Sequence, residues 1–119
     1  MYKIKKEFSF SASHQLKGLP DNHQCARLHG HNYKVIIELS SAKLDAIGFV
    51  RDYGELSAIK KYIDETLDHR HLNDVFDFNP TAENMAKFFY DYAKTLWPEV
   101  SSVAVSETDK TWSTYCAEN

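Results

Sequence analysis

Three histidines have the residue type and spacing of a metal site. His29 and His31 flank Gly30 in an alternating stretch typical of a strand, where both imidazoles project from one face; on a helix they would diverge by about 200°. His14 ends an earlier alternating stretch on its apolar side, so a hairpin can bring it to the same place. Three neutral imidazoles and an open position are typical of catalytic zinc. The alternative is a set of strand histidines that only pack or hydrogen-bond.

Cys25 lies four residues before His29 in a stretch that reads as a loop. A loop thiol beside a dication has the setting of a reactive thiolate, which could act as a base. It could equally be a fourth zinc ligand, which would make the site structural, or a bystander. The spacing leaves these three interpretations open. The second cysteine, Cys116, lies three residues from the end of the sequence and is interpreted as incidental.

The remaining polar candidates are a carboxylate–imidazole pair, a second carboxylate and a threonine. Asp68 precedes His69, but adjacent residues seldom bond to each other, and His69 needs a fold-back or another chain to approach the metal. Glu107 ends a predicted strand at a turn, where an acid is usually solvated. A buried carboxylate there could instead accept the two parallel N–H donors of a pterin or guanine edge. Thr81, before a predicted helix, is most simply its N-cap.

Hydrophobic periodicity indicates the elements that position these residues. Strands are expected over 2–14 and 29–39, a loop over 15–28, helices over 52–67 and 81–96, and two further strands around 103–105 and 112–115, separated by a turn at 108–110. The predicted fold class is α+β, with order ββααββ and two helices on one face of an antiparallel sheet. Four strands leave two open edges, which a chain of this size usually covers by association.

Composition narrows the class of protein. The 119 residues suit one domain, 1–119, and a net charge of -3 without a basic run argues against nucleic acid as a partner. No apolar stretch approaches the roughly 20 residues that cross a bilayer, and the N-terminus lacks a signal-peptide pattern, so we expect no membrane and a cytoplasmic location. There is no GxGxxG for a nicotinamide cofactor and no HExxH of a zinc hydrolase.

Taken together, these residues resemble the 6-pyruvoyltetrahydropterin synthase superfamily, which includes bacterial 6-carboxytetrahydropterin synthases. Five stretches carry the resemblance in family order and nearly end to end: FSFSASH at 8–14, CARLHGHNY at 25–33, LDHRHLN at 67–73, NPTAEN at 79–84 and VSET at 105–108. The resemblance implies a tunnelling fold, in which subunits close their sheets into an oligomeric barrel, with six subunits as the expected number (a dimer of trimers).

The resemblance also implies roles for the candidate residues. His14, His29 and His31 would bind Zn²⁺, which would hold the side-chain hydroxyls of the substrate. Cys25 would be the proton-abstracting thiolate. The catalytic pair Asp68 and His69 would relay protons, supplied by a neighbouring subunit. Glu107 would anchor the pterin ring, with Thr81 as a further contact.

The short Cys25-x-x-x-His29 spacing indicates which branch of the superfamily the chain resembles, because it looks like that of the bacterial carboxy-forming enzymes. The resemblance then implies a lyase that converts 7,8-dihydroneopterin triphosphate to 6-carboxy-5,6,7,8-tetrahydropterin, acetaldehyde and triphosphate, on the route to 7-deazaguanine and queuosine. Two alternatives stay open: a pyruvoyl-forming synthase that eliminates triphosphate without carbon–carbon cleavage, and a non-catalytic zinc-binding module. Lys17, Arg27 and Lys34 are candidate triphosphate contacts.

Overall fold

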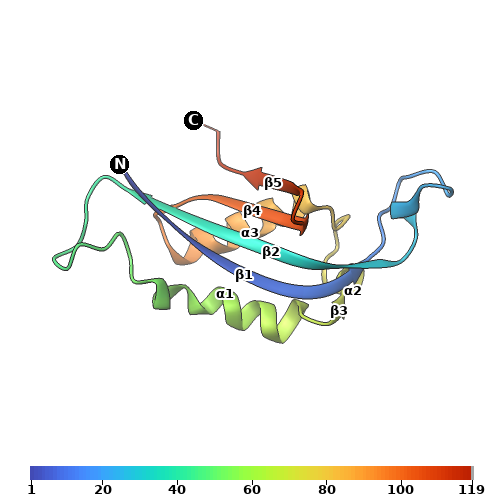
Figure 1. Cartoon of the computed structure of the whole chain (residues 1–119), viewed down its shortest axis with the longest axis horizontal. Helices are drawn as coiled ribbons and strands as arrows, with labels where there is room; N and C mark the ends of the chain where they lie inside the picture. Colours follow the sequence, from blue (N-terminus) through green and yellow to red (C-terminus); the bar gives the residue numbers. More distant parts are fainter. Residues whose placement is uncertain (119) are drawn as a thin grey trace.

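The computed structural model describes residues 1–118, which form a curved sheet with helices packed on one face (Figure 1). The strands are β1 (Tyr2–His14), β2 (His29–Ser41), β3 (Arg70–His71), β4 (Val100–Thr108) and β5 (Thr111–Tyr115). The helical elements are η1 (Gln24–Ala26), η2 (Tyr53–Leu56), α1 (Ser57–Tyr62), η3 (Ile63–Leu67), α2 (Leu72–Val75) and α3 (Ala82–Leu96). The predicted α+β class is therefore confirmed.

The sheet has the order β3-β1-β2-β4-β5. The long antiparallel hairpin β1–β2 pairs His14 with His29 and Ala12 with His31, as the hairpin prediction required. The prediction of four antiparallel strands was incomplete, because β3 adds two residues that pair parallel with β1. A two-residue strand is too short to show an alternating pattern, which explains why periodicity did not reveal it.

The first predicted helix is a succession of three helical segments, η2, α1 and η3. Asp52 caps it by accepting a hydrogen bond from the Gly54 N–H at 2.9 Å. The Glu55 carboxylate accepts a hydrogen bond from Arg51 at 2.7 Å. The last turn, η3, is π-helical, with the Asp68 N–H bonded to the Ile63 carbonyl at 2.9 Å. This wider turn places Asp68 at the edge of β1, where the Ser11 N–H donates a hydrogen bond to its carboxylate.

The core lies between the helices and one face of the sheet. Alternate residues of β1 and β2, such as Phe8, Phe10, Val35 and Ile37, are buried against α1, η3 and α3. His14 continues this series and is fully buried, although histidine is polar. Figure 1 shows the loop 15–28 projecting from the end of the sheet that lies away from the N-terminus. Among residues 1–118 no helix combines the length and apolarity that crossing a membrane demands.

Candidate active site

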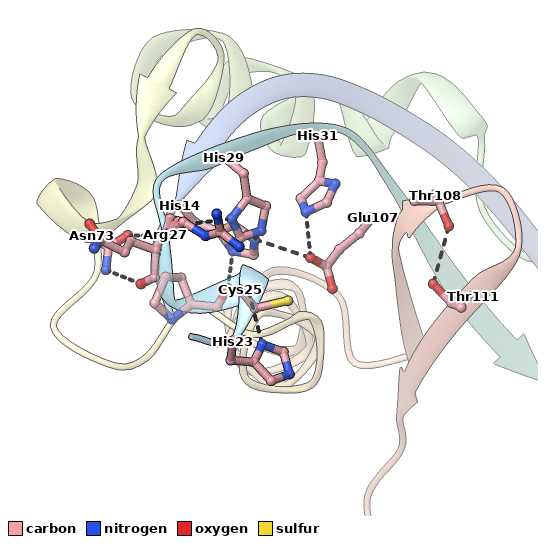
Figure 2. A network of polar contacts seen from close by, with 12 residues as sticks. His14, His23, Cys25, Arg27, His29, His31, Asn73, Glu107, Thr108 and Thr111 are labelled. Carbon is pink, nitrogen blue, oxygen red and sulfur yellow. Dashed lines mark hydrogen bonds and ion pairs between the residues drawn. The ribbon is translucent and has the colours of Figure 1, made fainter. Parts of the chain in front are cut away.

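The structure brings the three predicted ligands together at one end of the β1–β2 hairpin (Figure 2). His14, His29 and His31, joined by Glu107, form the group in residues 1–118 whose donor atoms could hold a metal ion, all lying within 4.8 Å of one another. The Nε2 atoms of His14 and His29 are 2.8 Å apart. The prediction that strand pairing collects these histidines is confirmed.

The outer ring nitrogens settle which atoms face inward. The Nδ1 of His14 lies 2.8 Å from the Pro80 carbonyl oxygen, and the Nδ1 of His29 lies 2.7 Å from that of Arg27. A carbonyl only accepts, so each Nδ1 must carry a proton and each neutral imidazole turns an Nε2 lone pair inward. Two lone pairs facing each other at 2.8 Å repel unless a cation lies between them. The donor set therefore fits a zinc ion, and the carbonyl partners orient the ligands as in other histidine metal sites.

Glu107 completes the cluster from β4. Its Oε2 lies 3.0 Å from the Nε2 of His31 and 3.2 Å from that of His14. The His31 contact lacks hydrogen-bond geometry, so the buried Nε2 of His31 has no hydrogen-bond partner. The His14 ring, 3.2 Å away, holds the pKa of Glu107 below its usual value, against the opposing effect of burial. Burial lowers the pKa of His31, although the Glu107 charge acts in the opposite direction.

Cys25 lies beside this cluster but outside the group of four. It belongs to the short helical turn η1 and lines a cavity of about 300 Å³ together with His29, Gly30 and His31. The thiol is half-buried and free of any disulfide. Glu107 is thus the fourth residue of the candidate donor group, and Cys25 lies at the wall of the adjacent cavity.

Asp68 and His69 bond directly, contrary to the expectation for adjacent residues. The Oδ2 of Asp68 lies 3.0 Å from the Nδ1 of His69, whose backbone adopts a positive φ of 60°. The Ser11 N–H donates to Asp68 at 3.0 Å, and the Ser11 carbonyl accepts from the His69 N–H at 2.6 Å. The Ser11 hydrogen bond, followed by that of His69, holds the pKa of Asp68 below its ordinary value.

Within one chain, His69 and Cys25 line two different cavities. His69 lines a hollow of about 490 Å³, which shares Gly30 and His31 with the cavity of Cys25. Ser11, Ser13 and Asn32 also line this hollow. These β1 and β2 residues alternate with Ala12 and His31, so their side chains project from the opposite face of the sheet. The structure therefore brings the three histidines and Glu107 together with Cys25 beside them, and leaves the Asp68–His69 pair outside this group.

The other predicted contacts have local partners. Thr81 is the N-cap of α3, because its Oγ1 accepts from the Asn84 N–H at 3.1 Å. Lys34 pairs with Asp109 at 2.9 Å, while the side chain of Arg27 is exposed.

Sequence reasoning missed three contributors to the site: the Pro80 carbonyl behind His14, the side chain of Asn73, which bonds Gln15, and the approach of Glu107 to the histidines. Only the last had a signal in the sequence. Val103, Val105 and Glu107 alternate on one face of β4, which is the face that the histidines share. The contacts of Pro80 and Asn73 join segments 58 or more residues apart and leave no local pattern.

Comparison with known proteins places this site in a family. The curated 6-carboxy-5,6,7,8-tetrahydropterin synthase of Bacillus subtilis is 33% identical over 127 residues, covering 96% of this chain and 84% of the relative. The protein of the same name from Synechocystis sp. is 35% identical over 117 residues, covering 91% of this chain and 88% of the relative.

Solved structures agree. The Caenorhabditis elegans 6-pyruvoyl tetrahydropterin synthase superposes with a TM-score of 0.85 at 27% identity, covering 98% of this chain and 96% of the other. The Plasmodium falciparum protein of that name, at 15% identity and a TM-score of 0.72, shares the fold. The family profile described as 6-pyruvoyl tetrahydropterin synthase matches residues 3–118. As its motifs predicted, the chain belongs to the 6-pyruvoyl tetrahydropterin synthase family of enzymes.

Proposed function

We propose that the protein is a zinc-dependent 6-carboxy-5,6,7,8-tetrahydropterin synthase acting in the cytoplasm on the route to 7-deazaguanine and queuosine. The reaction converts 7,8-dihydroneopterin triphosphate and water to the 6-carboxy pterin, acetaldehyde and triphosphate. The observation that carries the proposal is the convergence of the Nε2 lone pairs of His14 and His29 beside the cavity that Cys25 lines. The names of the curated relatives support the carboxy product.

Each residue has a proposed task. His14, His29 and His31 hold the metal, which supplies Lewis-acid stabilisation of negative charge on the substrate's side-chain oxygens. Cys25 removes a proton from the side-chain carbon next to the cavity. Glu107 accepts two N–H donors of the pterin edge, a geometry suited to a carboxylate.

The proton relay is proposed to come from another copy of the chain. His69 is not among the residues whose donor atoms lie within 4.8 Å of one another at the candidate metal centre, so its own chain does not place it among the ligands. Beyond the two residues paired with β3, the outer edge of β1 has no strand partner in residues 1–118, and β5 is the other edge. Edges of this kind favour strand addition between copies. We propose a homohexamer in which a neighbour's Asp68 and His69 reach each metal centre.

The test is a mass-spectrometric assay of the zinc-loaded protein with 7,8-dihydroneopterin triphosphate. Acetaldehyde together with a 6-carboxy pterin is the expected result. A pyruvoyl pterin without acetaldehyde would assign the chain to the pyruvoyl-forming branch. No turnover by zinc-replete protein would leave a non-catalytic zinc module.

The Cys25→Ala variant tests the role of the thiol separately. If Cys25 is the base, the variant keeps its zinc and loses turnover. If Cys25 is a ligand, zinc affinity collapses instead. Cys116→Ala is the matched control, because Cys116 is exposed at the far end of the sequence.

A further inference from the structure

Two asparagine side chains extend the β1–β3 pairing beyond the end of both strands. The Oδ1 of Asn73 accepts from the Gln15 N–H at 2.9 Å, and its Nδ2 donates to the Gln15 carbonyl at 2.8 Å. Asn79 does the same with the N–H and carbonyl of Lys17, at 3.0 and 3.1 Å. Each amide thus bonds both backbone groups of one residue, as a residue of a neighbouring strand would. The first residues of the loop 15–28 are held in line with β1 by these contacts.

Two of these loop residues, Gln15 and Leu16, also bind the segment that contains Cys25. The side chain of Gln15 donates through Nε2 to the Ala26 carbonyl at 2.9 Å, and the Leu16 N–H donates to the Cys25 carbonyl at 2.9 Å. The turn η1 around Cys25 has no buried residue, so no apolar anchor fixes it to the core. Its position depends on these hydrogen bonds and on the bond from the Cys25 N–H to His23 at 3.0 Å. Figure 2 draws Asn73 and Cys25 in one polar network.

We propose that Asn73 is a positioning residue that sets the place of the Cys25 thiol relative to the metal cluster, acting through Gln15 and Leu16. The inference rests on the proposed function, in which Cys25 is the base. Asn73 does not line the cavity of Cys25, so it does not touch the substrate there.

The three histidines are supported mainly by contacts outside the Cys25 turn, which makes the role distinguishable. The exception is the local contact of His29 with the Arg27 carbonyl, two residues away. His14 is held by the Pro80 carbonyl and by pairing with His29 in the β1–β2 ladder. Loss of the Asn73 amide therefore leaves the ligand set in place while it frees the Cys25 turn. A displacement of about 1 Å in a catalytic group can lower the rate by roughly 100-fold.

The experiment compares Asn73→Leu, which removes both bonds at similar size, with Asn73→Asp, which keeps the acceptor for the Gln15 N–H. We expect Asn73→Leu to lower kcat roughly 10- to 100-fold with KM within about 3-fold and zinc content unchanged. Asn73→Asp should recover part of that loss. Arg51→Met is the control for general destabilisation, since Arg51 binds Glu55 and Glu99 and touches nothing in the loop.

Amide hydrogen exchange provides a readout that does not need turnover. In Asn73→Leu the peptide spanning 15–28 should exchange at least 10-fold faster, while the core of β2 over 33–39 keeps its protection. Unchanged exchange in 15–28, or an equal increase throughout the chain as a purely structural role would give, would overturn the proposal. If the wild-type protein fails to turn over the pterin, the proposed function fails, and the exchange data still decide whether Asn73 positions the Cys25 turn.

Discussion

Asp68 and His69 are consecutive residues whose side chains nevertheless lie 3.0 Å apart, Oδ2 to Nδ1. The left-handed backbone of His69, at φ 60°, turns its ring back to the carboxylate. A non-glycine residue rarely adopts this conformation, which costs free energy and persists where the surroundings enforce it. Here the Ser11 N–H and carbonyl bind the two residues from β1. The result is an oriented carboxylate–imidazole pair with the imidazole exposed.

Asp68→Asn tests this pair as a proton relay. The carboxylate orients the His69 ring, so its loss should lower kcat by roughly 100-fold or more while zinc content stays the same. Steady-state kinetics with metal analysis measure both. Asp74→Asn, an exposed carboxylate six residues away, should leave kcat unchanged. A wild-type kcat in Asp68→Asn would remove the pair from the mechanism.

Glu107→Gln separates a pterin anchor from a metal ligand. As an anchor, Glu107 makes hydrogen bonds through a charged group, and its loss should raise KM by roughly 10- to 100-fold with zinc retained. As a ligand beside His14 and His31, its replacement would instead weaken zinc binding, and that outcome would contradict the proposed role. Equilibrium dialysis and kinetics distinguish the two, with exposed Glu83→Gln as the control.

Removal of the metal should lower thermal stability, because the inward lone pairs of His14 and His29 then repel. Zinc at 100 times its dissociation constant should stabilise the fold by about 2.7 kcal/mol. Calorimetry of chelated and zinc-loaded protein measures the difference in Tm. His29→Ala should abolish the zinc-dependent rise in Tm. His71→Ala should keep it, because the native His71 side chain bonds Ser13 and lies outside the metal cluster. A zinc effect that survives in His29→Ala would place the metal elsewhere.

Thr81 has a structural role and a proposed binding role, which two substitutions separate. Thr81→Ala removes the cap on α3 and should cost about 1 kcal/mol of unfolding free energy. Contact with the pterin would also raise KM, by roughly 3- to 10-fold for one hydrogen bond. Thr81→Ser should restore both. A loss of stability in Thr81→Ala with an unchanged KM would leave Thr81 as a cap only.

The ion pair of Arg51 and Glu99 predicts a pH-dependent contribution to stability. Two hydrogen bonds, at 2.7 and 3.0 Å, hold the pKa of Glu99 below its usual value. A carboxyl pKa that is lowered in the folded state stabilises the fold at pH values above the ordinary carboxyl pKa of about 4.3. This stabilisation disappears as the pH falls through the folded-state pKa.

Glu99→Gln should therefore cost about 1 kcal/mol at pH 7, after allowance for partial exposure, and progressively less as the pH falls below the ordinary carboxyl pKa of about 4.3. Urea unfolding with a chelator present measures the difference without a metal contribution. Asp91→Asn, in the exposed pair with Lys87, should change little at either pH. An equal cost of Glu99→Gln at both pH values would contradict the assignment.

Local patterns in the sequence determined most of the fold and the identity of the candidate metal ligands. Alternation placed His14 on the core face of β1 and His29 with His31 on one face of β2, because the side-chain period of a strand is two. The hairpin that this alternation predicts sets those residues opposite each other. The motifs over 8–108 then indicated the family.

Tertiary structure decided how the site is oriented and what supports it. The Pro80 carbonyl that fixes the His14 tautomer lies 66 residues away, and the amide that holds Gln15 lies 58 residues away. Such contacts leave no periodic trace, because they depend on where the π-helical turn and β3 return the chain to β1. The sequence by itself thus determined which residues could bind a metal. Their protonation, and the separation of the Asp68–His69 pair from them within one chain, arise only when distant segments pack side by side.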